Sequence, residues 1–220
     1  MTTSLDGMTL KDKQRALRAG FDAALALKVH RAISWIRRSE RETDDDDVRF
    51  VLLWIAFNAA YASEIGEEDG SERDLFAGYF GRLVALDGGR RIYDAVWMRF
   101  PHEIRNLLDN RFVYSPFWSF HNGVAAFADW EERLARSRKT IAGAMGRMDT
   151  PRVLSVVFDR LYVLRNQLVH GGATWNGAVN RAQVRDGAAI LGWLVPIFVD
   201  MMMDHPEEAW GMPYYPVVDS

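Results

Sequence analysis

Residues 150–172 read TPRVLSVVFDRLYVLRNQLVHGG, and this stretch has the features of one complete amphipathic helix. A threonine followed by a proline is typical of a helix start, because proline suits the first helical position. Apolar residues then recur at the spacing of one helical face, at Val153, Val156, Val157, Leu161, Leu164 and Leu168. Two glycines, Gly171 and Gly172, end the pattern. We therefore predict a helix over 151–170.

The same helical periodicity extends over most of the chain. It predicts further helices over 10–38, 48–64, 75–86, 90–100, 125–148 and 178–203, with the last one bent at Pro196. The least regular stretch, 100–122, is rich in aromatic residues and predicts one short helix with loops. No strand-like alternation persists, and no internal repeat is present. We expect an all-α fold, a single-domain helical bundle of about six to seven helices over 1–220, with 206–220 as a surface tail.

The composition is that of a folded protein with a large core. Hydrophobic residues make up 49% of the 220 residues and charged residues 26%. The chain has no cysteine, which excludes disulfides, thiol nucleophiles and zinc–thiolate sites and fits a cytoplasmic location. No basic segment followed by an apolar run opens the chain, so we expect no secretory signal. The longest apolar runs, 51–62 and 188–199, are shorter than the roughly 20 residues that cross a bilayer, so we expect no membrane contact.

Charge is unevenly distributed along the chain. The net charge of −3 argues against indiscriminate nucleic-acid binding. Residues 40–74 hold 12 acidic and 3 basic side chains, and their aspartate run at 44–47 is typical of a helix start. Residues 147–186 instead hold 6 arginines and 3 aspartates, a balance that would attract a phosphate-bearing substrate. The alternative is that both groups of charges only solvate helix faces.

Three side chains near the end of the 151–170 helix could carry chemistry together. Asn166 and His170 are four residues apart and therefore lie on one helix face. Arg165 lies five residues before His170, roughly 140° around an ideal helix, and its long side chain can span part of that angle. All three could therefore reach a common pocket, or one completed by a second chain.

These residue types suit cleavage of RNA without a metal or another cofactor. Histidine accepts and donates protons near neutral pH, and arginine presents a planar set of donors to phosphate oxygens. RNA supplies its own nucleophile, the 2′-hydroxyl, whereas DNA lacks it. A positioned acid/base group contributes about 10²–10⁴-fold to a rate. In the alternative interpretation, His170 only complements the helix C-terminus and Asn166 is a buried amide.

The segment 161–172, LYVLRNQLVHGG, resembles the signature of HEPN domains, in which an arginine and a polar residue precede a histidine. The segment 54–61, WIAFNAAY, is similar to a second-helix segment of bacterial HEPN proteins of the Apea-like kind. The resemblance implies a helical bundle that dimerises so that two motifs face each other. It also implies a catalytic pair, Arg165 and His170, supported by Asn166. Many members are metal-independent endoribonucleases in toxin–antitoxin or phage-defence systems, whereas others are inactive or bind only nucleotides.

Four further residues are candidates for substrate binding. Trp175 and Asn176 follow the motif directly, and an exposed tryptophan could stack on a base. Asn58 and Tyr61 lie in an apolar segment, where Asn58 could line the cleft or brace the motif helix. Most aromatic residues are expected in the core or at an interface. We expect no metal site, because the remaining histidines form no ligand pair at helical spacing.

The sequence thus leaves three hypotheses. The first is a homodimeric, metal-independent endoribonuclease acting on RNA, accompanied by an antitoxin or another protein partner. The second is a non-catalytic HEPN module that binds nucleotide, RNA or a protein partner. The third is a structural helical protein in which the motif merely ends a helix.

Overall fold

The computed structural model describes residues 5–62 and 72–217, and in this part of the chain it contains ten α-helices and no strand. The predicted all-α class is confirmed, but the predicted number of helices, six to seven, was too low. The α-helices are α1 Gly7–Leu17, α2 Ala23–Ser39, α3 Asp46–Tyr61, α4 Glu72–Leu86, α5 Arg91–Asp94, α6 Pro101–Asp109, α7 Ser115–His121, α8 Trp130–Gly146, α9 Thr150–Val169 and α10 Arg181–Asp204. A π-helical turn, Ala95–Arg99, continues α5, and short 3₁₀ turns lie at Arg18–Gly20, Arg111–Val113 and Ala125–Phe127.

The single helix predicted over 10–38 was wrong, because this stretch forms α1 and α2. Between them the chain makes a 3₁₀ turn that ends at Gly20. Asp22 then caps α2, and its carboxylate accepts the backbone N–H of Leu25 at 2.7 Å. A glycine followed by an N-cap aspartate is a local start signal that outweighs the continuing apolar periodicity.

The stretch 100–122 contains two α-helices, α6 and α7, rather than the predicted single short helix with loops. Pro101 and Pro116 lie in the first turn of these two helices. Proline has no backbone N–H to lose there, so it starts a helix as readily as it ends one. The sequence also predicts a turn at 66–70 and a helix start at Ser71, and both lie outside the described residues.

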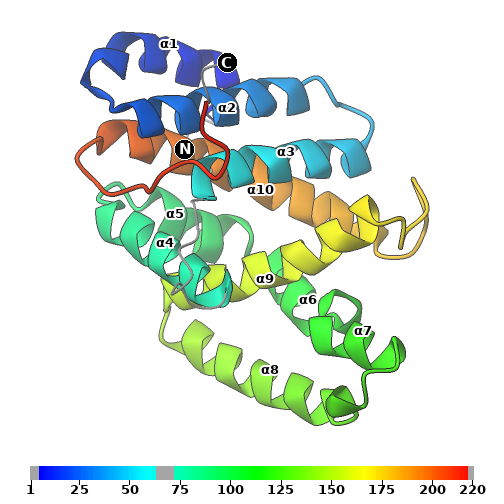
Figure 1. Cartoon of the computed structure of the whole chain (residues 1–220). Coiled ribbons are helices and arrows are strands. Elements are labelled where there is room, and N and C mark those ends of the chain that lie inside the picture. Colours follow the sequence, from blue (N-terminus) through cyan, green and yellow to red (C-terminus); the bar gives the residue numbers. More distant parts are fainter. Residues whose placement is uncertain (1–4, 63–71, 218–220) are drawn as a thin grey trace.

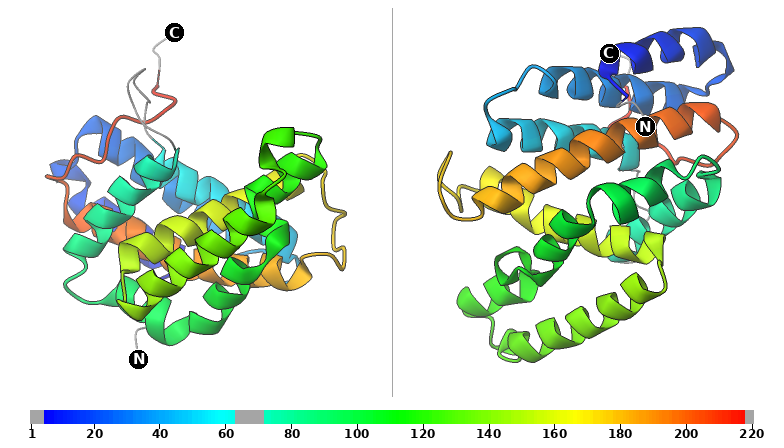
Figure 2. Two further views of the ribbon diagram at one scale, coloured as in Figure 1. Left: turned by 90° about the horizontal axis from the view of Figure 1, so that it is seen from below. Right: turned by 180° about the vertical axis from the view of Figure 1, so that it is seen from behind.

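The helices are arranged around α9 and α10. Helices α2, α3 and α10 lie side by side, with α1 along their edge, and α9 lies below them (Figure 1). On its other side, α9 is flanked by α6, α7 and α8, and the view from behind shows the same order (Figure 2). This arrangement leaves the C-terminal end of α9 at one end of the bundle, next to the loop that leads to α10.

The core is formed by aromatic and aliphatic residues shared among α3, α4, α9 and α10. Phe158 of α9 is fully buried, and its ring centroid lies 4.5 Å from that of Phe57 and 4.7 Å from that of Phe80. A Cβ on Gly187 would come within 2.8 Å of Phe50, so this glycine permits close packing of α10 against α3. A smaller cluster, formed by Tyr114, Phe117, Trp130 and Leu134, joins α7 to α8.

Among the described helices, α10 is long and apolar enough to cross a membrane by length and composition. The most apolar window of α10 is 78% buried inside the bundle, which is also what a core helix of this length shows. Beyond α10, the described part of the expected surface tail is non-helical and mostly exposed, but Trp210 is buried. The buried Lys28 donates to the carbonyl oxygen of Trp210 at 2.9 Å and so holds the tail on the bundle.

Candidate functional site

The motif lies at the C-terminal end of α9, close to where the sequence predicted it. The helix starts one residue earlier than expected, because Asp149 rather than Thr150 is the cap and accepts the backbone N–H of Arg152 at 3.2 Å. His170 is the C-cap, and its backbone N–H donates to the carbonyl oxygen of Asn166 at 3.0 Å. Gly171 follows with φ of +70°, a left-handed conformation that favours glycine at a helix end.

Arg165 and Asn166 contact each other directly. A guanidinium nitrogen of Arg165 donates to the side-chain oxygen of Asn166 at 2.8 Å, and both residues are half-buried. The guanidinium carbon also lies 5.8 Å from the ring centroid of Tyr162, one turn earlier in α9. The guanidinium of Arg165 therefore lies near Asn166 and Tyr162, toward the N-terminal end of the motif.

His170 is exposed to solvent at the end of the helix. Within the described residues, no group is hydrogen-bonded to its ring, so both ring nitrogens are accessible to a ligand or a second chain. Asn166 lies one helical turn before His170, on the same face. The structure thus pairs Arg165 with Asn166 and leaves His170 one turn further along, facing water.

Gln167, a residue of the motif that sequence analysis did not select, anchors this end of α9. Its side-chain nitrogen donates to the carbonyl oxygen of Phe112 at 2.5 Å, and its side-chain oxygen accepts from the amide of Asn180 at 2.9 Å. One side chain thereby connects α9 to the turn before α7 and to the loop before α10. No local signal in the sequence indicates this role, since Phe112 is 55 positions away.

The predicted substrate-binding residues Trp175 and Asn176 lie in the 171–180 loop, which is attached to the start of α3. The indole N–H of Trp175 donates to Asp45 at 2.7 Å, although 69% of the residue is exposed. The backbone N–H of Asn176 donates to Asp47 at 2.8 Å, and Arg181 donates twice to the same carboxylate, at 2.7 and 2.8 Å. The exposed face of Trp175 is available for stacking, whereas the backbone of the loop is fixed.

The aspartate run has two functions. Asp45 caps α3 by accepting the backbone N–H of Val48 at 3.0 Å, as the sequence predicted for a helix start. This bond and the one from Trp175 hold the pKa of Asp45 below its ordinary value. The same run also positions the loop that follows the motif, which the sequence did not indicate.

Asn58 and Tyr61, the other two candidates, lie in the last turn of α3, about 16 Å and about 21 Å along the helix axis from Asp47. Tyr61 stacks on Phe57 with ring centroids 5.1 Å apart. Asn58 is half-buried, and its side chain makes no hydrogen bond within the described residues. In the described part of the chain, no hydrogen bond or ring contact joins either residue to Arg165, Asn166 or His170, so the structure does not bring these two candidates together with the motif.

The described residues contain no group of three or more histidine, aspartate or glutamate side chains placed to hold a metal ion. His121 is exposed and packs its ring against Phe117, with centroids 4.3 Å apart. The chemistry that the site can offer comes from the motif side chains themselves: one imidazole, one guanidinium and two amides.

No family model, curated protein or solved structure matches this chain. The resemblance to HEPN domains therefore rests on the motif residues and on their place at the end of α9.

Proposed function

We propose that this protein is a metal-independent endoribonuclease that cleaves RNA through attack by the 2′-hydroxyl of the substrate. The observation that carries the proposal is the placement of Arg165, Asn166 and His170 on one accessible helix end. The guanidinium of Arg165 is already oriented by Asn166, at 2.8 Å, and the ring of His170 reaches solvent. We infer a cytoplasmic protein.

The reaction requires a proton acceptor and a proton donor. His170 would take the proton of the 2′-hydroxyl while that oxygen attacks the adjacent phosphorus, and Arg165 would stabilise the charge that develops on the phosphate oxygens. The bond to the 5′-oxygen breaks, and this oxygen leaves with a proton. The products are a 2′,3′-cyclic phosphate and a 5′-hydroxyl.

A homodimer would supply the second acid/base group, because a single histidine cannot accept and donate at the same moment. Apolar side chains are unusually exposed around the motif: Val169 is 51%, Trp175 69% and Val179 73% exposed. Exposed apolar residues that cluster beside a site favour an interface. Two copies joined here would place two His170 side chains in one cleft.

One observation favours the alternative, a non-catalytic module that binds nucleotide, RNA or a protein partner. Arg165 is turned back over Tyr162, whereas His170 lies beyond it at the helix end. In this alternative, Arg165 and Trp175 would hold a phosphate and a base without cleavage. A role in toxin–antitoxin or phage-defence systems, with an antitoxin as protein partner, is part of the proposal in either case.

The test is incubation of a structured RNA with the purified protein in EDTA, in parallel with His170→Ala and Arg165→Ala. His102→Ala is the matched control, because His102 is an exposed histidine on another helix, α6. Cleavage by the parent and by His102→Ala only, with cyclic phosphate ends, supports the endoribonuclease. RNA retention by the parent and by His170→Ala without cleavage, weakened in Arg165→Ala, supports the RNA-binding module. Absence of both cleavage and RNA binding overturns the endoribonuclease and the RNA-binding form of the alternative.

A further inference from the structure

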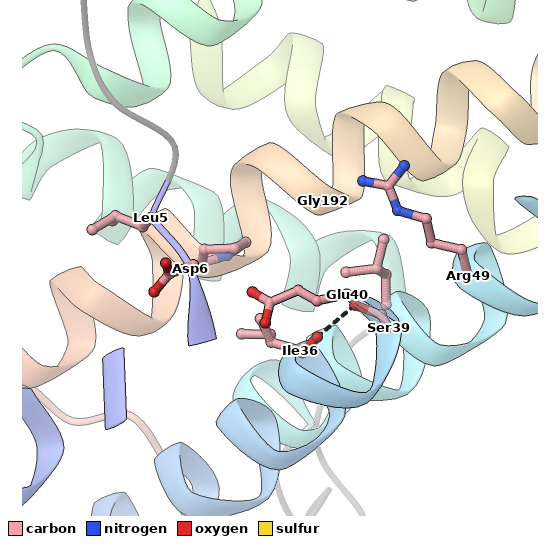
Figure 3. A pocket seen from close by; sticks show the side chains of 9 residues that line it. Leu5, Asp6, Ile36, Ser39, Glu40, Arg49 and Gly192 are labelled. Atoms are coloured by element: carbon pink, nitrogen blue, oxygen red, sulfur yellow. Dashed lines mark hydrogen bonds between the residues drawn. The ribbon is translucent and has the colours of Figure 1, made fainter. Parts of the chain in front are cut away.

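A cavity of about 350 Å³ lies apart from the motif, between the start of α1, the end of α2, the first half of α3 and the middle of α10. Figure 3 shows it from close by. Its lining residues are Leu5, Asp6, Ile36, Ser39, Glu40, Arg49, Leu53, Gly192 and Pro196. The volume is within the range of small-molecule sites, which starts at about 300 Å³.

One end of the cavity is formed by a cation without a partner. Arg49 is half-buried, and within the described residues its guanidinium makes no hydrogen bond, ion pair or ring contact. Its Nη2 would lie 3.1 Å from a Cβ placed on Gly192, and the side chain extends over the backbone of α10 there (Figure 3). A partly desolvated guanidinium is stabilised when a carboxylate occupies its planar set of donors.

The other end of the cavity carries two carboxylates. Asp6 accepts the backbone N–H of Thr9, and Glu40 accepts that of Gly7, each at 2.7 Å. Each of these bonds uses one carboxylate oxygen, so each group keeps a second oxygen that can accept a proton donor. In Figure 3 these two carboxylates lie toward Leu5, away from the guanidinium of Arg49.

The walls between the two charged ends are aliphatic. Leu5, Ile36, Leu53 and Pro196 contribute hydrocarbon, and no lining residue is aromatic, so the cavity offers no stacking surface for a base. Gly192 lies inside α10, where glycine costs about 0.5–1 kcal/mol relative to alanine. Its missing side chain lets Arg49 and Leu53 lie against α10, because a Cβ there would lie 3.1 Å from Nη2 of Arg49 and 3.5 Å from Leu53.

We propose that this cavity binds a small aliphatic zwitterion, with its carboxylate on Arg49 and its ammonium group between Asp6 and Glu40. An ω-amino acid, in which a chain of methylene groups separates the ammonium group from the carboxylate, has this chemistry. Opposite charges at the two ends disfavour a simple anion or a simple cation, since each would leave one end unmatched. This site is independent of RNA cleavage.

The test is titration calorimetry of the parent protein with 5-aminopentanoate and its two singly charged analogues, pentanoate and pentylamine. We expect saturable 5-aminopentanoate binding and at least about tenfold weaker binding of both analogues. Arg49→Gln should weaken 5-aminopentanoate binding by about tenfold or more, whereas Arg152→Gln, at an exposed arginine on α9, should leave it unchanged. Gly192→Leu should abolish binding, and its helix content by circular dichroism should match the parent.

Three results would overturn the proposal. The first is no saturable 5-aminopentanoate binding up to about 10 mM, which corresponds to an affinity too weak for a formed site. The second is equal binding of 5-aminopentanoate and either analogue. The third is unchanged 5-aminopentanoate binding by Arg49→Gln, and this result does not depend on whether the Gly192 variant folds.

Discussion

Arg181 and Asp47, 134 positions apart in the sequence, are joined by two hydrogen bonds of 2.7 and 2.8 Å between the guanidinium and the carboxylate. This pair connects the first residue of α10 to the first turn of α3. The carboxylate of Asp47 also accepts the backbone N–H of Asn176. A single buried side chain therefore holds the loop that follows the motif at two points, Asn176 and Arg181.

Replacing Asp47 by alanine should destabilise the protein by about 2–4 kcal/mol, because three hydrogen bonds are lost and Arg181 remains partly buried without its partner. The measurement is urea unfolding followed by circular dichroism. Asp46→Ala is the control, because the neighbouring Asp46 loses only its helix-dipole interaction, about 0.3–1 kcal/mol. Equal losses for the two variants would contradict the role given to Asp47.

Gln167→Ala should lower the free energy of unfolding by about 1–2 kcal/mol, because two hydrogen bonds that hold the end of α9 are lost. If the protein cleaves RNA, the same variant should lower the turnover rate more than RNA affinity, since Gln167 positions the motif and need not touch RNA. Rates and affinities are measured on one RNA. A Gln167→Ala protein with the turnover rate of the parent would show that this anchor does not position the motif.

Trp54→Phe should change stability by less than about 1.5 kcal/mol, although Trp54 is in the core. Within the part of the chain that the structure describes, its buried indole N–H has no hydrogen-bond partner, and losing an unsatisfied donor offsets part of the lost packing. Phe158→Ala is the comparison, with an expected loss of about 3–5 kcal/mol because it leaves a cavity among Phe57, Phe80 and Trp54. A loss for Trp54→Phe as large as that for Phe158→Ala would mean that the indole N–H is in fact satisfied.

Lys28 should make stability depend on pH in the alkaline range. Burial lowers its pKa from the ordinary value of 10.5 to about 8. Between these values the unfolded chain keeps a proton that the folded protein has lost, so stability rises with pH. Below pH 8 both states are protonated, and the destabilising effect of the buried ammonium group is fully present.

The measurement is the free energy of unfolding at pH 7, 8, 9 and 10 for the parent and for Lys28→Met. Over the upper part of this range, the parent should gain up to about 1.4 kcal/mol per pH unit relative to the variant. Lys139→Met, at an exposed lysine of α8, should follow the parent. A constant difference between the parent and Lys28→Met at all four values would disprove the lowered pKa.

Local signals in the sequence were sufficient for the motif helix. The periodicity and the two glycines place its end within one residue of the observed Val169. The same reasoning joined α1 and α2 incorrectly, because apolar spacing continues through a break that is set by Gly20 and the Asp22 cap. Periodicity describes which face is buried, whereas helix boundaries depend on single capping residues.

The sequence grouped Arg165, Asn166 and His170 because they are close in the chain, but it did not predict the direct hydrogen bond between Arg165 and Asn166. It could not predict the bond from Gln167 to Phe112 or the clamp from Asp47 to Arg181, because these partners are 55 and 134 positions apart. Such contacts depend on how α3, α9 and α10 pack together. Likewise, the segment 54–61 in α3 did not indicate how far its residues lie from the motif. Asn58 and Tyr61 lie at the opposite end of α3 from Asp47.

The central claim is that the 2′-hydroxyl of RNA is the nucleophile and that His170 assists it. The most direct measurement starts from a mapped cleavage site in one RNA and replaces the single ribose before the cleaved phosphate by 2′-deoxyribose. We predict that the parent protein no longer cleaves this bond, while it cuts the all-ribose strand to a 2′,3′-cyclic phosphate and His170→Ala cuts neither strand. Continued cleavage at the deoxy position, or full activity of His170→Ala, would contradict the account.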